Sequence, residues 1–283
     1  MIQAKHRNRL PLPQPAVVHV RRSYADCRYG QIHVWTAYPS GGGFDERTPI
    51  VCLHHAGGSG RLFAPALREL GNDRSIYAPD LPGHGTSDVP TSRASVADFA
   101  GALGDFLDSL RLRSVDVFGY QLGALAAAEL AIARPQQVRR VMLWGVASYS
   151  AQERGALLGQ VNALGTREDG SDVADEWRLQ LERRGPGVPM STLTDALSDR
   201  LRAGAHGARA AAAAFDYPVA ERLPLVKQQS VVLRLRDEFG DYAPRIRSAL
   251  PNSSLLDLPE HGRDFIGAAP QRFAAVIREF CDR

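Results

Sequence analysis

Cysteine is scarce in this chain of 283 residues, and the three cysteines form no recognisable pattern. Cys27, Cys52 and Cys281 are odd in number and far apart, and none belongs to a Cys-x-x-Cys pair. Disulfide-rich folds and structural zinc sites need cysteines at close, regular spacings, so the sequence predicts neither. A reducing compartment fits this composition, and we expect a cytoplasmic protein.

Long apolar runs and basic stripes are also missing. No run of about 18 apolar residues, the length that a membrane-spanning helix needs, occurs in the chain. Residues 1–15 are basic and proline-rich but lack the apolar segment of a signal peptide, so we interpret them as a flexible leader. The net charge of +3 does not come from a basic stripe interleaved with aromatic residues. We therefore expect a small-molecule substrate or ligand as partner, and neither nucleic acid nor membrane.

What the chain does contain is a regular alternation of apolar β-type runs with helical patterns. A sequence of this length with 44% hydrophobic and 23% charged residues can bury one large core. Two β-type runs that flank a turn near Gly30 predict an antiparallel start to a sheet. Continuous apolar runs that alternate with helical segments predict buried parallel strands joined by crossovers. The first two runs are 16–20 and 31–38, and the later ones are 49–55, 74–79, 115–118 and 138–146.

The alternation stops after residue 146. Residues 147–216 are helical in pattern, rich in arginine and alanine, and broken by glycines, which predicts an insertion of two to four helices. The alternation resumes over 230–235, 242–250 and 254–258 and ends with a helix over 270–281. We predict an α/β fold with a doubly wound, mostly parallel sheet of about eight strands. In this prediction 16–146 and 217–283 form the core, and 147–216 form a helical cap.

A sharp strand-to-helix turn is expected at residues 119–123, Gly-Tyr-Gln-Leu-Gly. A β-rich run meets an alanine-rich helix there, with no room for a loop between them. Such a turn places its central residue, Gln121, in a sparsely populated backbone region, while the two glycines let strand and helix pass closely. A glutamine amide has no ionisable proton in the working pH range, so it is not a useful nucleophile.

From residue 16 to 281 the order of parts resembles the α/β-hydrolase family, whose Gly-x-Ser-x-Gly turn carries the serine nucleophile. Residues 54–58, His-His-Ala-Gly-Gly, are similar to the family's His-Gly-x-Gly-Gly turn, with His55 replacing a glycine. Residues 80–87 match the family's loop after the fourth strand. The resemblance implies that the backbone N–H groups of Ala56 and Leu122 form an oxyanion hole, and we expect His55 and Tyr120 to contact the substrate.

The family's acid follows its seventh strand and its histidine follows the eighth. By resemblance these are Asp237, with Glu238 as the alternative, and His261. A neutral imidazole held by a carboxylate is a competent general base near neutral pH. At the family's nucleophile position this chain has Gln121, and the chemistry of its amide excludes a covalent acyl-enzyme there. The resemblance implies no cofactor.

A metal site could be imagined from four histidines, His54, His55, His84 and His261. Adjacent residues on a strand point to opposite faces, so only one of His54 and His55 faces the site, and we predict no metal. His84 lies in a Gly-His-Gly turn, and a structural role is expected for it.

Three functions compete at this point. In the first, a His261–Asp237 dyad acts as a general base on a small, largely apolar, carbonyl-containing substrate, without a covalent step. In the second, the protein is a catalytically inactive homologue that binds a small apolar ligand as a sensor or carrier. In the third it is a scaffold for partners, which calls for an exposed apolar patch that the sequence does not show. The presence of both dyad residues favours the first.

Overall fold

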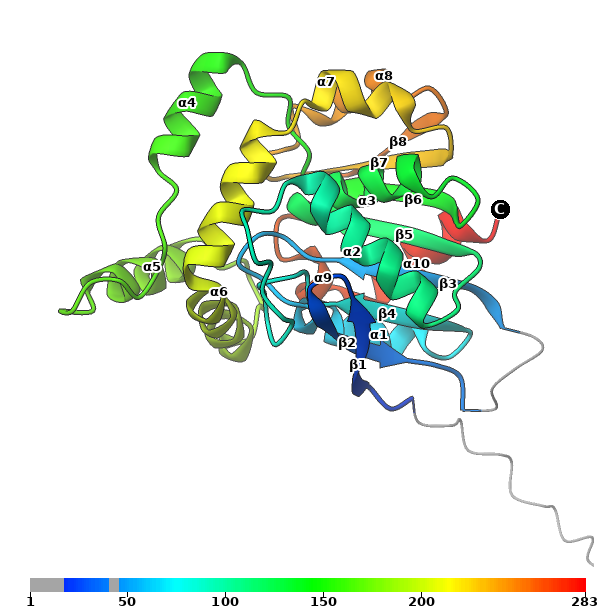
Figure 1. Cartoon of the computed structure of the whole chain (residues 1–283), viewed down its shortest axis with the longest axis horizontal. Helices are drawn as coiled ribbons and strands as arrows, with labels where there is room; N and C mark the ends of the chain where they lie inside the picture. Colours follow the sequence, from blue (N-terminus) through cyan, green and yellow to red (C-terminus); the bar gives the residue numbers. More distant parts are fainter. Residues whose placement is uncertain (1–17, 41–45) are drawn as a thin grey trace, which may run out of the picture.

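An eight-stranded sheet in the order β1-β2-β4-β3-β5-β6-β7-β8 forms the centre of the molecule (Figure 1). The structure, a computed structural model, describes residues 18–40 and 46–283, so the predicted leader lies outside the described residues. Strands β3 to β8 run parallel, whereas β2 is antiparallel to both of its neighbours. The predicted fold class is therefore confirmed. The strands are β1 (Arg21–Cys27), β2 (Gly30–Ala37), β3 (Arg47–Leu53), β4 (Arg74–Pro79), β5 (Val115–Tyr120), β6 (Val138–Trp144), β7 (Gln229–Leu235) and β8 (Ser253–Leu258).

The first strand lies later in the chain than the sequence pattern indicates. Residues 18–20 precede β1 and are not in a strand, so the predicted strand at 16–20 is wrong within the described part. The observed β1 pairs with β2 in a hairpin that brings Cys27 opposite Gly30, which confirms the antiparallel start. The first four residues of β1 are exposed, because the strand lies at the edge of the sheet. An exposed strand does not need apolar side chains, so β1 shows no apolar run in the sequence.

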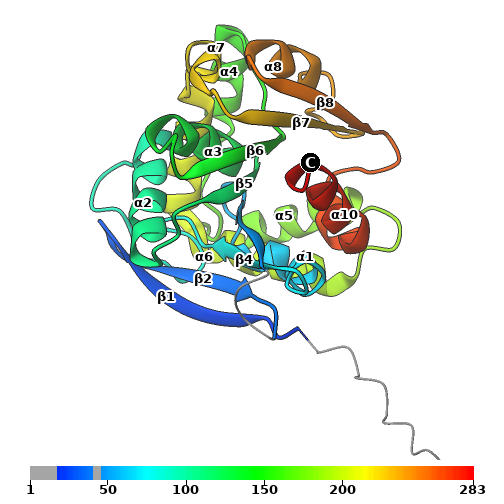
Figure 2. The same ribbon diagram turned by 90° about the vertical axis from the view of Figure 1, so that its right-hand side faces the viewer.

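Helices cover both faces of the sheet (Figure 2). One core cluster joins the sheet to α2, α3 and α8, and a second joins its other face to α1, α9 and α10. Ser95 caps α2 with a reciprocal capping box formed with Asp98. The helices on the sheet are α1 (Ala64–Leu70), α2 (Val96–Ser109), α3 (Leu122–Ala133), α7 (Val219–Arg222), α8 (Ala243–Ala249), α9 (Phe265–Ala268) and α10 (Pro270–Cys281), with short 3-10 turns at Gly60–Phe63 and Leu223–Leu225.

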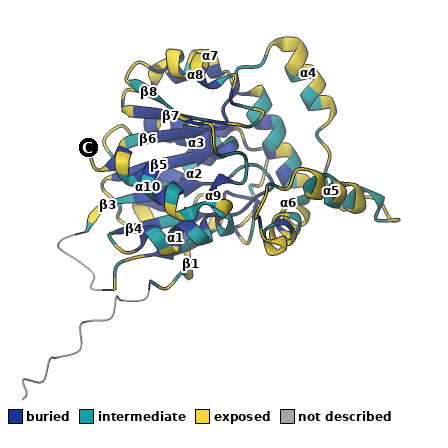
Figure 3. Cartoon of the chain, turned by 180° about the vertical axis from the view of Figure 1, so that it is seen from behind, coloured by how far each residue is buried: buried dark blue, intermediate teal, exposed yellow. Residues whose placement is uncertain are grey.

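Three further helices follow β6 and lie to one side of the sheet (Figure 1). They are α4 (Ala151–Gly159), α5 (Ser171–Glu182) and α6 (Met190–Asp216), and α6 is kinked at Gly204, where φ is 45° and ψ is −126°. Figure 3 shows that the sheet is mostly buried, whereas α4 and the outer part of α5 are largely exposed. Residues 147–216, for which the sequence predicts an insertion of two to four helices, contain these three helices and no strand. None of the helices in the described ranges is both long and apolar enough to cross a membrane.

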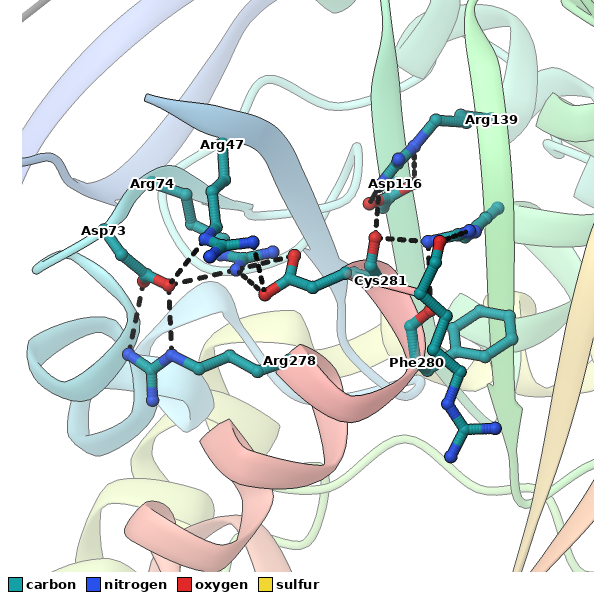
Figure 4. A network of polar contacts seen from close by, with 11 residues as sticks. Arg47, Asp73, Arg74, Asp116, Arg139, Arg278, Phe280 and Cys281 are labelled. Atoms are coloured by element: carbon teal, nitrogen blue, oxygen red, sulfur yellow. Dashed lines mark hydrogen bonds and ion pairs between the residues drawn. The ribbon is translucent and has the colours of Figure 1, made fainter. Parts of the chain in front are cut away.

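A network of polar contacts fastens α10 to the amino-terminal ends of the strands (Figure 4). Arg74, at the start of β4, is completely buried, and its Nη2 bonds to Asp73 at 3.0 Å and to Asp282 at 2.8 Å. Arg278 of α10 reaches Asp73 from the other side at 3.1 Å. Next to this group, Arg139 pairs with Asp116 and donates to the backbone oxygen of Cys281 at 2.7 Å. These contacts occupy the amino-terminal edge of the sheet, so the opposite edge is left for the site.

Candidate active site

The turn between β5 and α3 has the strained geometry that the sequence predicts. Gln121 has φ 51° and ψ −115°, and it is one of two described non-glycine residues with positive φ. A Cβ atom at Gly119 would lie 2.3 Å from the backbone oxygen of Gly123, and one at Gly123 would lie 2.2 Å from that of Leu53. Both glycines are therefore required by the close passage of strand and helix. The Gln121 side chain is fixed by a hydrogen bond of 3.0 Å from its Nε2 to the Tyr120 hydroxyl.

Two backbone N–H groups at this edge lack partners. Across residues 18–40 and 46–283, no hydrogen bond satisfies the N–H groups of Ala56, after β3, or Leu122, at the start of α3. Both residues line the same cavity. The loop that carries Ala56 is fixed to the loop after β4, because the Asp80 carboxylate accepts a hydrogen bond of 2.7 Å from the N–H of Gly60. Two free donors beside a helix N-terminus form an arrangement that favours a partly negative oxygen.

A cavity of about 630 Å³ opens above this turn, between the carboxyl ends of the strands and helices α4 to α6. Gln121, Tyr120 and His55 lie in its wall on the sheet side. The helical side has more apolar than polar residues, and its apolar members include Leu157, Leu179, Leu193, Ala208, Ala211 and Phe215. Polar side chains such as Gln160, Asn162 and Gln180 lie among them. The volume and the lining suit a small organic molecule.

The helical side of the cavity is tied to the sheet side by polar contacts. Ser59 donates to Asp199 of α6 at 2.6 Å, and Arg61 bonds to the same carboxylate at 2.6 Å. Burial nevertheless raises the pKa of Asp199, and the two hydrogen bonds offset only part of this effect. These contacts set the position of α6 relative to the loop after β3.

Four charged residues of the cavity form two ion pairs that the sequence analysis missed, while Arg183, Arg184 and Asp264 also line it. Arg200 of α6 contacts Glu176 of α5 at 2.6 Å, and Arg263 pairs with Glu238. Burial acts to raise the pKa of Glu238, but the hydrogen bond from Arg263, a backbone hydrogen bond and the nearby guanidinium charges together lower it. Arg263 is two residues after His261 in the sequence, and this proximity could have predicted that Arg263 lies near the site. The position of Arg200 depends on how α6 folds over the sheet, and no local pattern reveals it.

The two dyad residues predicted by resemblance are not joined. Asp237 Oδ2 accepts from Trp144 Nε1 at 2.7 Å and its Oδ1 accepts from the N–H of Phe239 at 2.9 Å. Burial raises the pKa of Asp237, an effect that these hydrogen bonds oppose.

His261 makes contacts of its own. Its Nε2 lies 3.4 Å from Glu260, and its ring stacks on Phe265 at 4.3 Å. Throughout the described residues, no hydrogen bond or ion pair connects His261 with Asp237, and neither side chain lines the cavity. The expected contact between the two dyad residues is therefore not formed in this structure, and the buried indole N–H of Trp144 bonds to one carboxylate oxygen of Asp237.

The histidines after β3 behave as the strand geometry predicts. His55 lines the cavity and His54 does not. His54 donates from Nδ1 to the His55 backbone oxygen at 2.7 Å and accepts from the N–H of Leu81 at 2.9 Å. Burial lowers the pKa of His54 to about 3 and that of His84 to about 4, so both are neutral structural groups. In the described ranges no three His, Cys, Asp or Glu side chains are grouped so that they could hold a metal ion.

Several known proteins are similar to this chain. Over 120 residues it is 34% identical to 2-hydroxymuconate semialdehyde hydrolase of a Pseudomonas species. This match covers 40% of each of the two chains. It is 27% identical to (E)-2-((N-methylformamido)methylene)succinate hydrolase of Acinetobacter baylyi, over 42% of this chain and 46% of that one. The matches thus span less than half the length of these curated relatives.

Solved structures and a family model cover more of the chain. An enol-lactonase from Burkholderia xenovorans superposes with a TM-score of 0.76 at 16% identity, over 92% of this chain and 100% of that one. A hydrolase from Pseudomonas aeruginosa superposes with the same TM-score at 19% identity, over 93% and 98%. At these identities the likeness shows the fold alone. The model of the alpha/beta hydrolase fold family matches residues 48–237, about two thirds of the sequence. The chain therefore belongs to the α/β-hydrolase fold family.

Proposed function

We propose that this protein binds a small, largely apolar carbonyl compound beneath helices α4 to α6, and that it does so without forming an acyl-enzyme. The carbonyl oxygen would be held by the N–H groups of Ala56 and Leu122, which then act as an oxyanion hole. The observation that carries the proposal is Gln121, which occupies the strained turn where the family has its nucleophile. Its amide has no ionisable proton and is held by Tyr120.

The arrangement of the remaining groups supports a binding role, as a sensor or carrier. General-base catalysis needs an imidazole within reach of the substrate and oriented by a carboxylate. His261 and Asp237 are instead engaged with other partners and lie outside the cavity lining. In this proposal α4 to α6 serve as a cap, and the apolar side chains of that cap exclude water from the bound carbonyl.

A second candidate is an enzyme that lacks a covalent step, in which His261 aligns on Asp237 and activates water or removes a proton. One contact favours it: the N–H of Arg236 donates to the backbone oxygen of His261 at 2.8 Å, so the two loops are neighbours. The similarity to hydrolases of carbonyl compounds gives it further support. Turnover of a ketone or ester that is lost in His261→Ala would select this candidate.

The binding proposal can be tested with two compounds that differ only in a carbonyl group. We expect deoxybenzoin (1,2-diphenylethanone) to bind more tightly than bibenzyl (1,2-diphenylethane) in calorimetric titrations. With a ¹³C-labelled carbonyl, the infrared stretch of bound deoxybenzoin should fall to the range of a hydrogen-bonded ketone, because two N–H groups polarise it.

Substitutions on one helix locate the binding site. Ala211 of α6 lines the cavity, so Ala211→Trp should abolish binding by filling it. Ala205→Trp, at an exposed position of the same helix, is the matched control and should bind normally. Equal affinity for both compounds, or a carbonyl stretch typical of an apolar solvent, would contradict the proposal.

A further inference from the structure

His55 is the cavity residue whose role the family resemblance leaves unassigned, since it stands where the family has a glycine. Its ring is held in one orientation. The Nδ1 atom lies 2.9 Å from the backbone oxygen of Ala56, and the ring meets Tyr120 edge-on at 5.5 Å. A Cβ atom at Gly58 would lie 3.0 Å from Cε1 and Nε2, so the ring rests directly on that glycine.

The contact with Ala56 determines which ring nitrogen carries the proton. A carbonyl oxygen only accepts hydrogen bonds, so Nδ1 is the donor and, in the neutral ring, Nε2 is left with a lone pair. Burial lowers the pKa of His55, the hydrogen bond to Ala56 opposes this, and the guanidinium groups of Arg200 and Arg263 lower the pKa further. The neutral ring therefore presents an acceptor at Nε2 near neutral pH.

Within residues 18–40 and 46–283, no hydrogen bond reaches this acceptor, the Nε2 atom of His55. The neighbouring His54 is the contrast, because both of its ring nitrogens are bonded to the backbone. Both ring nitrogens of His54 are thus engaged, whereas His55 lies in the cavity wall with one ring nitrogen that no described residue bonds.

We propose that Nε2 of His55 accepts a hydrogen bond from a hydroxyl group of the ligand, so that the site selects carbonyl compounds with a hydroxyl on the adjacent carbon. This inference rests on the proposed function, because the hydroxyl is placed by a carbonyl held at Ala56, the next residue. The donor is an uncharged hydroxyl and not an ammonium group. Arg200 and Arg263 act on His55 from nearby, and they would repel a cation.

Four related compounds separate the inference from the proposed function. Bibenzyl lacks the carbonyl, deoxybenzoin has it, benzoin adds an adjacent hydroxyl, and benzoin methyl ether has the same oxygen without its proton. We expect benzoin to bind about 3- to 10-fold more tightly than deoxybenzoin, the range of one neutral hydrogen bond. The methyl ether should lose this gain because it has no proton to donate.

Two variants test whether His55 is the acceptor. His55→Phe keeps a ring against Tyr120 and Gly58 but removes the nitrogen, so the affinity ratio of benzoin to deoxybenzoin should fall to about one. His206→Phe changes a histidine of α6 that does not line the cavity, and it should leave the ratio unchanged. In ¹⁵N NMR spectra, Nε2 of free His55 should appear as an unprotonated nitrogen and shift when benzoin binds.

The outcomes are distinguishable. Equal affinities of benzoin and deoxybenzoin, a ratio that survives in His55→Phe, or a protonated Nε2 in the free protein would overturn the inference alone. Deoxybenzoin that binds no better than bibenzyl, or failure of all four compounds to bind, would overturn the proposed function.

Discussion

The indole N–H of Trp144 donates a hydrogen bond of 2.7 Å to Asp237, the carboxylate that the family resemblance pairs with His261. Trp144 is buried and its ring also stacks on Tyr120 at 4.1 Å, the residue that precedes Gln121. One tryptophan at the end of β6 therefore contacts both the acid and the turn. It takes one of the two carboxylate oxygens to which His261 would bond in the expected dyad.

A serine at position 121 should fold but react slowly while Trp144 holds Asp237. We expect Gln121→Ser to be labelled weakly by a fluorophosphonate, and the double variant Gln121→Ser/Trp144→Phe to be labelled at least about tenfold faster, because a freed carboxylate can orient His261. Mass spectrometry of the labelled protein gives the rates and the site. The wild-type protein should not be labelled at all.

The controls for this prediction are the single variant Trp144→Phe, which should stay unlabelled, and thermal unfolding of each protein. Loss of the buried hydrogen bond should lower the free energy of unfolding of Trp144→Phe by about 1–3 kcal/mol. Labelling of the wild-type chain within residues 119–123 would show that Gln121 is not the reason for the missing covalent step.

The strand-helix turn should not tolerate a methyl group. Gly123→Ala places a Cβ atom 2.2 Å from the backbone oxygen of Leu53, so it should cost about 2 kcal/mol or more of unfolding free energy in urea titrations. Gly155→Ala in α4 is the matched control, because its Cβ atom has no atom within 4 Å. This control should gain up to about 1 kcal/mol from helix propensity. Similar stabilities of the two variants would count against the close passage at the turn.

His261→Ala should leave the affinity for deoxybenzoin within about twofold, because the ring does not line the cavity. The variant should lose some thermal stability, since the ring stacks on Phe265. Calorimetric titration and a thermal melt measure the two quantities. If a substrate is found whose turnover falls by about 10² or more in His261→Ala, and less in Asp237→Asn, the enzyme candidate replaces the binder.

Acidification should destabilise the fold through its buried histidines. An unfolded imidazole titrates near pH 6.5, whereas the folded pKa values are about 3 for His54 and about 4 for His84. Between these limits the unfolded chain binds more protons, so stability is full above pH 6.5 and falls as the pH drops toward 4. Each histidine contributes a slope of up to about 1.4 kcal/mol per pH unit.

Urea titrations from pH 7 to pH 4.5 measure this slope. His84→Gln should reduce it by about one histidine's share, and a replacement of the exposed His19 should not change it. A stability that is constant between pH 6.5 and 5 would contradict the neutral, buried state of both rings.

Features set by neighbours in the chain were predictable from the sequence. The turn at Gln121 follows from two glycines between a β-rich run and a helix, and the start of α2 follows from Ser95 three residues before Asp98. The strand β1 was misplaced because an exposed edge strand needs no apolar pattern.

The candidate site was less predictable, because its side chains choose partners across the fold. Asp237 has Trp144, 93 residues away, as its donor, and Arg200 reaches the cavity only because α6 crosses above the sheet. The resemblance to the family located the loops that bear Asp237 and His261 but not the contacts that their side chains make.

The network between β4 and α10 also constrains how the molecule assembles. Arg74 and Asp282 are separated by 208 residues, so their contact closes a loop that contains most of the sheet. Closing such a loop early is entropically costly, and the contact gains little until the strands between the two residues have paired. The network therefore forms late on the folding pathway, and weakening it should speed unfolding while leaving the folding rate almost unchanged.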